Sequence, residues 1–316
     1  MKNKSISSPL VSIIMNCYNG EKYLKEAVDS VIAQTYKNWE IIFFDNASTD
    51  RSKEIINSYK NDKIKFFSSK TNTTLGKARN KAISKCSGLF IAFLDVDDLW
   101  LPKKLEKQIP LFENSKVGVV ICDTFFFEND KNVKQLYKFK KPPTGNVFSD
   151  LLMNSFISLE TVIIRKKCLK KLDHFFDERF SMIEEYDFFL RILLNWELNY
   201  VDEVLAKWRI HSSSWTWKKA DLFPLEREMM IDKFKTNISD FSVEYFSEIK
   251  AMKIRGLINN FELLWSENKG KSGRELIKKH IFYNKKIFIL FIFSFLPHRV
   301  YCSLKKKIES VILFYK

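Results

Sequence analysis

The first hundred residues alternate between two hydrophobic patterns. Short apolar runs, typical of buried strands, cover residues 11–15, 40–44, 64–67 and 89–94. Between them, apolar residues recur at helical spacing over residues 21–35, 48–59 and 75–85. Strands that alternate with helices in this way form βαβ units. We therefore predict an α/β fold with a mostly parallel central sheet and helices on both faces.

Polar residues follow three of these strands. Open α/β sheets bind ligands beyond the carboxyl ends of their strands, and residues 16–19, 45–50 and 95–98 stand at those ends. We expect the functional residues at this edge of the sheet. The sequence has neither the glycine-rich fingerprint of dinucleotide-binding proteins nor a P-loop.

The remaining two thirds of the chain are less regular. We predict strands over residues 117–127 and 159–164, a basic mobile loop over 131–145, a helix over 184–196 and helical structure over 222–265. The expected organisation is one domain of residues 1–220, followed by a helical region of residues 221–316.

An apolar run of ten residues, 287–296, lies near the end of the chain. As a helix it would be about 15 Å long, half of the roughly 30 Å of a bilayer core, so it cannot span a membrane alone. The net charge of +15 is concentrated around it, because residues 269–316 hold 12 Lys and Arg against 2 Asp and Glu. This pattern favours an anchor on an anionic membrane surface, with a core helix and a solvated basic tail as the alternative. It does not favour a nucleic-acid-binding groove.

The cysteines and the N-terminus indicate the cellular compartment. Five cysteines with no CxxC pair suggest neither a disulfide framework nor a zinc site, and they favour a reducing environment. The first ten residues, MKNKSISSPL, contain no apolar segment of the signal-peptide type. We expect a cytoplasmic protein.

Three carboxylates stand close together in the segment Asp95-Val96-Asp97-Asp98. They repel one another unless a cation lies among them, and hard oxygen ligands favour Mg²⁺ or Mn²⁺. The alternative is a solvated acidic turn. Asp45 follows another strand, where a carboxylate can accept hydrogen bonds from a base or a ribose, although residues 48–50 also form a cluster that can cap a helix.

The candidates outside these loops each have an ordinary structural alternative. Arg79 can meet a phosphate or a carboxylate, or it can lie on a solvated helix face. Glu184 and Glu185 begin a predicted helix, where its dipole favours acidic residues. Asp187 and Arg191 have the spacing of a helical ion pair. His211 joins the acidic site only if the fold returns it to Asp97.

Six segments occur in a characteristic order, namely VSIIMNCYN, QTYKNWEIIFFDNASTD, TLGKARNKAI, IAFLDVDDLWLPKKLEKQ, EEYDFFLR and RIHSSS. Together they closely resemble the family 2 glycosyltransferases over about residues 9–215. The resemblance implies a GT-A fold, a nucleotide-diphosphate-sugar donor, a divalent cation (Mn²⁺ or Mg²⁺) and transfer with inversion at the anomeric carbon. It also implies that residues 1–220 are the catalytic domain, with a nucleotide-binding half of about residues 9–100 and an acceptor half of about residues 101–220.

The resemblance also implies roles for residues that match the family's motifs. Asp45 is expected at the donor base, Asp95 near the ribose and Asp97 on the metal, because Asp95 and Asp97 match the family's DxD motif. His211 stands where some relatives place a metal or diphosphate contact. The remaining donor-site candidates are Asn16, Tyr18 and Arg79.

The catalytic base is expected among the acidic residues before Tyr186. Glu185 matches the second position of the family's ED pair, where Asp is more common, and Glu184 is the alternative. Asn16 stands where Pro is common, and Asn46-Ala47 replaces a frequent Asp-Gly. None of these departures removes a carboxylate with an implied role.

The resulting hypothesis is a metal-dependent, inverting glycosyltransferase of surface polysaccharide or lipopolysaccharide assembly. It would take a UDP-sugar, act on a glycan or lipid-linked acceptor, and attach peripherally to the inner face of the cell membrane through its tail. No nucleic-acid partner is expected. A nucleotidyltransferase with the same metal carboxylates and a non-catalytic nucleotide-sugar-binding protein are the alternatives.

Overall fold

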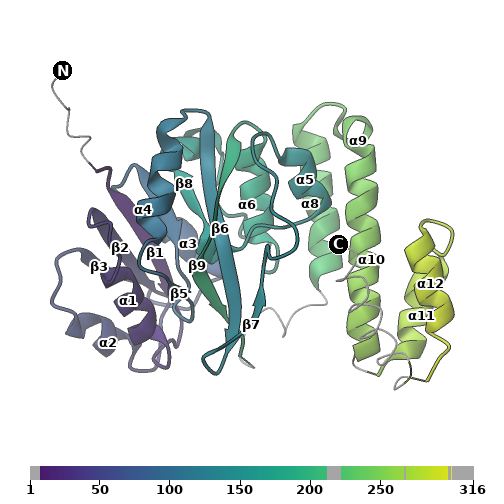
Figure 1. The fold of residues 1–316 in the computed structure, drawn as a ribbon, viewed down its shortest axis with the longest axis horizontal. Coiled ribbons are helices and arrows are strands. Elements are labelled where there is room, and N and C mark those ends of the chain that lie inside the picture. Colours follow the sequence, from purple (N-terminus) through teal and green to yellow (C-terminus); the bar gives the residue numbers. More distant parts are fainter. Residues whose placement is uncertain (1–7, 212–221, 267, 298–299, 301–316) are drawn as a thin grey trace. The chain divides into compact units, whose positions relative to one another are not determined.

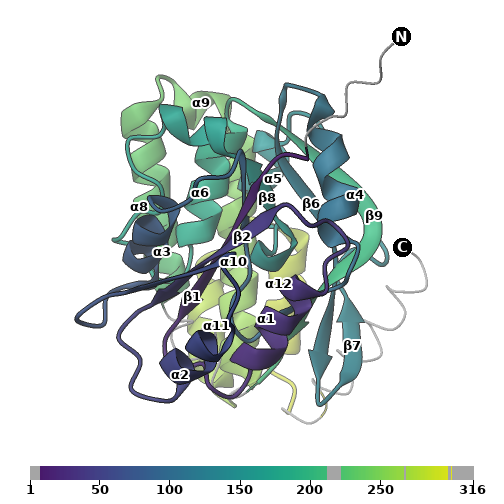
Figure 2. The same ribbon diagram turned by 90° about the vertical axis from the view of Figure 1, so that its left-hand side faces the viewer.

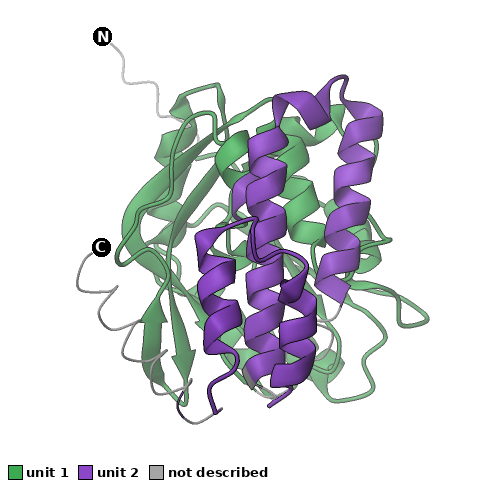
Figure 3. Cartoon of the chain, turned by 90° about the vertical axis from the view of Figure 1, so that its right-hand side faces the viewer, with its two compact units in different colours: residues 1–151, 155–220 green, residues 152–154, 221–316 purple. Residues whose placement is uncertain are grey.

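The chain folds into two compact units. The structure, a computed structural model, describes residues 8–211, 222–266, 268–297 and 300. The first unit contains residues 1–151 and 155–220, and the second contains residues 152–154 and 221–316 (Figure 3).

Nine strands of the described first unit form one sheet (Figure 1). Their order is β3-β2-β1-β4-β8-β6-β9-β5, and β7 pairs with β6. Pairing is parallel among β1 to β4 and between β6 and β9, whereas β4–β8, β6–β8, β5–β9 and β6–β7 are antiparallel. The strands are β1 (Val11–Cys17), β2 (Trp39–Asp45), β3 (Ile64–Ser68), β4 (Phe90–Phe93), β5 (Leu99–Trp100), β6 (Val117–Glu128), β7 (Lys131–Gln135), β8 (Ile163–Arg165) and β9 (Glu197–Arg209).

Helices and 3₁₀ turns connect these strands. The α-helices are α1 (Leu24–Ile32), α2 (Ser52–Ser58), α3 (Leu75–Ile83), α4 (Lys104–Gln108), α5 (Phe148–Met153) and α6 (Glu184–Leu193). The 3₁₀ turns are η1 (Ile109–Glu113), η2 (Leu159–Thr161) and η3 (Lys166–Lys171). The α/β class is therefore as predicted.

Both faces of the parallel strands are covered, which explains their unbroken apolar runs. Ile13 and Met15 of β1 belong to one core cluster together with Leu24 and Val28 of α1. The residue between them, Ile14, is also buried and points to the opposite face, because side chains alternate along a strand. Helix α3 packs against β1 and β2, and Figure 2 shows α1 and α3 on opposite sides of these strands.

One predicted loop is partly a strand. Residues 131–135 of the expected mobile loop form β7, which pairs antiparallel with β6. The two residues between these strands, Asn129 and Asp130, have φ values of 45° and 63°. Positive φ at both central residues is the geometry of a tight hairpin turn, and Asn and Asp tolerate it. The prediction of a loop was wrong because β7 is polar and shows no apolar alternation.

Two further segments differ from the prediction. Residues 159–161 form η2, so that the expected strand begins only at Ile163. The long strand β9 was not predicted, because it follows directly after the apolar helix α6 without a glycine or proline to separate them.

The described second unit is helical. It contains α8 (Phe223–Asn237), α9 (Phe241–Glu244), α10 (Phe246–Ser266), α11 (Gly270–Lys278) and α12 (Lys285–Phe293). A small core joins Phe261 and Trp265 of α10, Ile277 of α11, and Ile287 and Leu290 of α12. Among the described residues, no helix has the length and hydrophobicity that a membrane crossing needs.

The apolar run near the chain end has two different faces. Ile287 and Leu290 are buried in the small core, whereas Phe288, Ile289 and Ile292 are 45%, 48% and 49% exposed. One face of this segment packs as a core helix does, and the other face is an exposed apolar surface of the kind that a membrane anchor needs. The segment therefore combines features of both interpretations. The last sixteen residues, 301–316, lie outside the described residues.

Candidate active site

Hydrogen bonds connect the loop after β1 to the loop after β2. The backbone N–H of Asn19 donates to the Ser48 hydroxyl at 2.9 Å, and the Asn19 side-chain oxygen accepts from the Thr49 N–H at 2.8 Å. Asn19 itself has a φ of 55°, a left-handed conformation that Asn tolerates. The two strand ends therefore form one connected rim.

The segment Asn46-Ala47 is placed by backbone geometry. Ala47 has a φ of 64°, where a side chain is disfavoured, and this explains why glycine is frequent at this position in the family it resembles. The buried Asn46 side chain donates to the Thr73 carbonyl at 2.8 Å and accepts from the Thr73 N–H at 3.1 Å. It thereby fixes the loop that leads into α3.

Three donor-site candidates lie at these strand ends. Asp45 ends β2 beside Cys17 of β1, is 5% exposed, and accepts a weak hydrogen bond from the Ser48 N–H at 3.3 Å. Both amide atoms of the buried Asn16 lack a hydrogen-bond partner within the described chain, whereas Tyr18 is 54% exposed. Buried polar atoms are seldom left unpaired, so Asn16 is suited to receive a polar ligand.

The acidic loop after β4 contacts the end of β9. Asp97 Oδ2 lies 2.9 Å from His211 Nε2, and both side chains are partly accessible. Strand β5, which follows the acidic loop directly, pairs antiparallel with β9, with Leu99 opposite Lys207. In an antiparallel pair, positions before Leu99 lie opposite positions after Lys207. The fold therefore returns His211 to Asp97, which is the condition that the sequence left open.

Arg209 holds this arrangement in place. Its backbone N–H donates to Asp98 Oδ1 at 2.8 Å, and its Nε donates to the Asp97 carbonyl at 2.8 Å. The guanidinium also lies against two aromatic rings, 4.3 Å from the ring centroid of Tyr23 and 4.5 Å from that of Phe127. Asp98, buried and bonded to backbone, is thus a structural carboxylate, whereas Asp97 remains accessible.

Arg79 is the centre of the second cluster. Its side chain is only 1% exposed, so the interpretation as a solvated helix residue is excluded. Its Nη1 lies 2.8 Å from Glu185 and 3.1 Å from Glu184, and its Nη2 lies 3.3 Å from Asp95. The Arg79 guanidinium therefore links the end of β4 to the first turn of α6 through ion pairs.

The two glutamates of α6 differ in accessibility. The Glu184 side chain is 5% exposed and that of Glu185 is 32% exposed. Of the two, Glu185 is the one that a substrate can reach. The Asp187–Arg191 pair predicted on the same helix is present at 2.8 Å.

Burial, together with neighbouring carboxylates, raises the pKa of Glu185 and of Asp95. Burial raises the pKa of Glu185 to about 8, with Arg79 opposing and Glu184 and Asp95 adding to the shift. The pKa of Asp95 is also raised by burial, against the lowering effect of Arg79. A cation bound nearby would lower both values, because it favours the charged carboxylates.

The chemistry of Asp97 and His211 fits a divalent cation. A carboxylate oxygen and an imidazole nitrogen are both metal ligands, and Asp95 lies two residues from Asp97. Another acidic group, His174 with Asp177 and Asp187, has a ligand-like spacing. There, however, Arg179 and Arg191 contact the two aspartates at 2.7 and 2.8 Å, so this group is an ion-pair network.

Comparison with known proteins identifies the family. The family described as "Glycosyl transferase family 2" matches residues 12–173. The chain belongs to the family 2 glycosyltransferases. An uncharacterized glycosyltransferase of Methanocaldococcus jannaschii is 34% identical over 211 residues, which cover 65% of this chain and 72% of that protein.

A second relative has a specific name. The UDP-Glc:alpha-D-GlcNAc-diphosphoundecaprenol beta-1,3-glucosyltransferase of Escherichia coli is 30% identical over 207 residues, covering 65% of this chain and 79% of that protein. Among solved structures, S. aureus TarS in complex with UDP-GlcNAc is similar, with a TM-score of 0.66 and 20% identity over 90% of this chain and 84% of that chain. This likeness confirms the GT-A fold of the glycosyltransferase.

The structure thus groups the candidates predicted from sequence into three sets. Arg79 contacts Asp95, Glu184 and Glu185, and Asp97 contacts His211. Asn16, Tyr18 and Asp45 lie at the ends of β1 and β2, and the strand order β2-β1-β4 separates Asp45 from Asp95 by one strand. Their functional roles stay predictions.

Sequence reasoning gave no role to Asn19, Asn46 or Arg209. Arg209 belongs to the RIHSSS segment, but its contacts with the acidic loop depend on the pairing of β5 with β9, which the sequence pattern did not reveal.

Proposed function

We propose that this glycosyltransferase moves a sugar from a UDP-sugar to a glycan or lipid-linked acceptor, with inversion and with Mn²⁺ or Mg²⁺ as cofactor. The observation that carries the proposal is the contact of buried Arg79 with Asp95 on one side and with Glu184 and Glu185 on the other. The Arg79 guanidinium thereby holds both Asp95, the candidate donor-binding carboxylate, and Glu185, the candidate base.

The donor is proposed to bind along the ends of β1, β2 and β4. Asp45 and the unpaired amide of Asn16 would meet the base or ribose, and Tyr18 offers an exposed ring for stacking. Two of the compared proteins support a uridine nucleotide, because UDP-Glc and UDP-GlcNAc appear in their names.

Asp97 and His211 are proposed to hold the cation, with Asp95 beside them. When bound, the cation neutralises charge that develops on the departing diphosphate. The chain's own contribution is to fix this pair, since Arg209 binds the carbonyl of Asp97 and the carboxylate of Asp98.

Glu185 is proposed as the general base. A sugar hydroxyl is a poor nucleophile at neutral pH, and a carboxylate that removes its proton during attack promotes the reaction. Arg79 positions this carboxylate. One displacement by the acceptor hydroxyl inverts the anomeric configuration, and the chain then needs no covalent nucleophile.

The acceptor and the location are also proposals. The E. coli relative acts, by its name, on a sugar linked to diphosphoundecaprenol. A similar lipid-linked acceptor in surface polysaccharide or lipopolysaccharide assembly is consistent with the exposed apolar face of α12. We infer attachment at the cytoplasmic face of the membrane.

Release of nucleoside diphosphate from a donor panel tests this function. UDP-Glc, UDP-Gal, UDP-GlcNAc and GDP-Man would be incubated with Mn²⁺, beside an Asp97→Asn control. We expect slow UDP release from at least one UDP-sugar, and little from the control. In a parallel incubation with UTP and a sugar 1-phosphate, release of inorganic diphosphate would instead indicate a nucleotidyltransferase. Donor binding without turnover, with or without glycan acceptors, would indicate a binding protein.

A further inference from the structure

The helical second unit contains a cavity of about 700 Å³. This volume lies within the range of small-molecule sites, about 300–1,000 Å³. The cavity lies among α8, α10 and the segment after α11, and all of its lining residues belong to this one unit. Its charged and imidazole-bearing lining residues are Arg227, Glu228, Lys250, Lys253 and His280.

The lining combines an apolar wall with cationic groups. The wall includes Ile249, Ile254 and Leu257 of α10. Arg227, Lys250 and Lys253 contribute three positive charges against the single carboxylate of Glu228, which contacts Lys253 at 2.8 Å on the exposed surface. A site of this composition complements a ligand that has both a hydrocarbon part and at least two negative charges.

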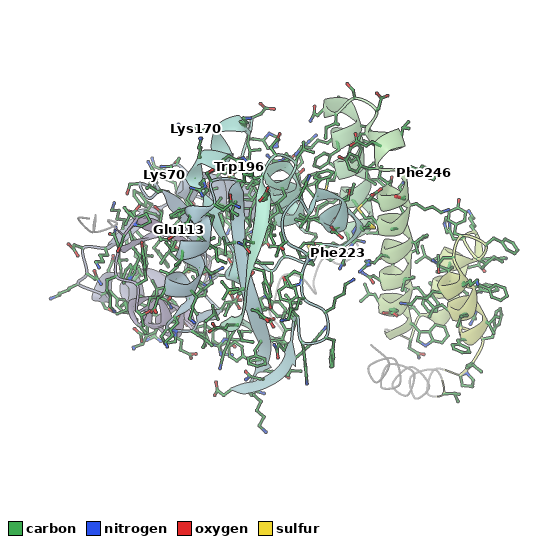
Figure 4. All side chains as sticks on the ribbon, turned by 45° about the horizontal axis from the view of Figure 1, so that its top comes forward. Lys70, Glu113, Lys170, Trp196, Phe223 and Phe246 are labelled. Atoms are coloured by element: carbon green, nitrogen blue, oxygen red, sulfur yellow. The ribbon has the colours of Figure 1, made fainter. Side chains whose placement is uncertain are left out.

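Gly256 lets the side chain of Arg227 approach α10 closely. A Cβ placed on Gly256 would lie 2.9 Å from Nη1 of Arg227, closer than real Cβ contacts come. The guanidinium also lies 5.4 Å from the ring centroid of Phe223, and Figure 4 labels this residue and Phe246. Gly256 therefore makes room for Arg227 beside α10, where a larger residue would displace it.

His280 adds a polar group to the lining of the cavity. The Nδ1 atom of His280 is buried without a hydrogen-bond partner in the described part of the chain. A neutral imidazole can donate one hydrogen bond and accept another. In the tautomer that carries the proton on Nδ1, this atom would donate a hydrogen bond to an anionic oxygen bound beside it.

Exposed aromatic residues surround the same region. Phe246 and Tyr283 line the cavity and are 66% and 57% exposed, and the neighbouring Phe282 is 90% exposed. Large exposed apolar side chains close together mark an interaction surface rather than ordinary protein surface. Aromatic rings of this kind are enriched where proteins meet the membrane interface.

We propose that this cavity binds a lipid diphosphate, with the diphosphate at Arg227, Lys250 and His280 and the first part of the hydrocarbon chain along the apolar wall of α10. The net charge of the lining matches a diphosphate diester better than a phospholipid head group with one charge. The inference rests on the proposed function, in which the acceptor is lipid-linked, and it assigns a separate site to the lipid portion.

Farnesyl diphosphate is a suitable probe, and its binding to the full chain can be measured by calorimetry. Lys250→Ala removes one cation, and we expect about tenfold weaker binding, the usual effect of losing a charge-assisted contact. Gly256→Leu fills the cavity and displaces Arg227, and it should abolish binding. Lys235→Ala is the matched control, because Lys235 lies on α8 outside the lining and pairs with Asp232.

Each comparison has an outcome that overturns the inference. The inference is wrong if the wild type and both cavity variants bind farnesyl diphosphate with equal affinity. It is also wrong if inorganic diphosphate or farnesol binds as tightly as farnesyl diphosphate. Full competition by equimolar phosphatidylglycerol in mixed phosphatidylcholine vesicles would identify a membrane phospholipid as the occupant instead. UDP-sugar hydrolysis is measured with the same preparations to separate the two proposals. If the wild type binds farnesyl diphosphate in the cavity but hydrolyses no UDP-sugar, only the proposed function is contradicted.

Discussion

Nη1 of Arg79 lies 2.8 Å from Oε1 of Glu185, and the same guanidinium contacts Asp95 and Glu184. Arg79 is buried, and three carboxylates depend on its single charge. Removing one partner of a buried ion pair is costly because the remaining charges are left without compensation. This arrangement makes Arg79 both a structural and a positioning residue.

Arg79→Met should lower the free energy of unfolding by about 3 kcal/mol at pH 8, as expected for breaking a buried ion pair. The deficit should shrink at pH 5, because the freed carboxylates can then be protonated. Urea unfolding at both pH values measures it. Lys77→Met, an exposed position on the same helix, is the control, and an equal deficit at the two pH values would contradict the explanation.

Glu185→Gln should reduce sugar transfer by about 10²–10⁴-fold, the usual contribution of a general base. The affinity for the UDP-sugar should stay nearly unchanged. Glu184→Gln should have a much smaller effect, because the Glu184 side chain is only 5% exposed. Transfer rates and donor calorimetry for both variants decide the matter, and an inactive Glu184→Gln with a normal Glu185→Gln would exchange the two roles.

The rate should depend on pH through Glu185, whose pKa is raised to about 8 by burial. A general base acts in its deprotonated form, so kcat/KM should rise with pH below about 8 and level off above it. Raising Mn²⁺ from a limiting to a saturating concentration should move the midpoint to lower pH, because a nearby cation favours the carboxylate. The residual activity of Glu185→Gln should lack this dependence, and an unchanged profile in that variant would assign the titration to another group.

Asp97→Asn should weaken Mn²⁺ binding and reduce turnover by about 10²–10³-fold, the cost of losing one group that stabilises developing charge. His211→Ala should also weaken Mn²⁺ binding, since the two side chains are 2.9 Å apart. Electron paramagnetic resonance of free Mn²⁺ measures affinity independently of activity. Asp62→Asn, at an exposed aspartate between α2 and β3, serves as a control. Full wild-type activity in excess chelator would refute the metal site.

Phe288→Glu/Ile292→Glu should shift the protein from the membrane to the soluble fraction. Both side chains lie on the exposed apolar face of α12, at 45% and 49% exposure, so the fold should tolerate the change. The matched control is Leu225→Glu/Val243→Glu, at exposed positions of α8 and α9. Flotation with anionic vesicles gives the comparison, and equal release by both pairs would place the membrane contact elsewhere.

The sequence by itself determined the α/β class and the positions of its candidate site residues. Buried parallel strands need continuous apolar runs, so β1, β2 and β4 were visible, and the polar residues that follow them had to lie at one edge of the sheet. Local spacing also revealed the ion pair of Asp187 and Arg191, because helix geometry alone brings such residues together.

Only the tertiary structure decided which distant residues meet. Asp97 reaches His211 through the pairing of β5 with β9, and a two-residue strand leaves no readable pattern. Arg79 resembled a solvated helix residue until the fold surrounded it with carboxylates from β4 and α6. The difference in exposure between Glu184 and Glu185 has the same origin, because burial depends on what packs against a helix and not on the helix sequence alone.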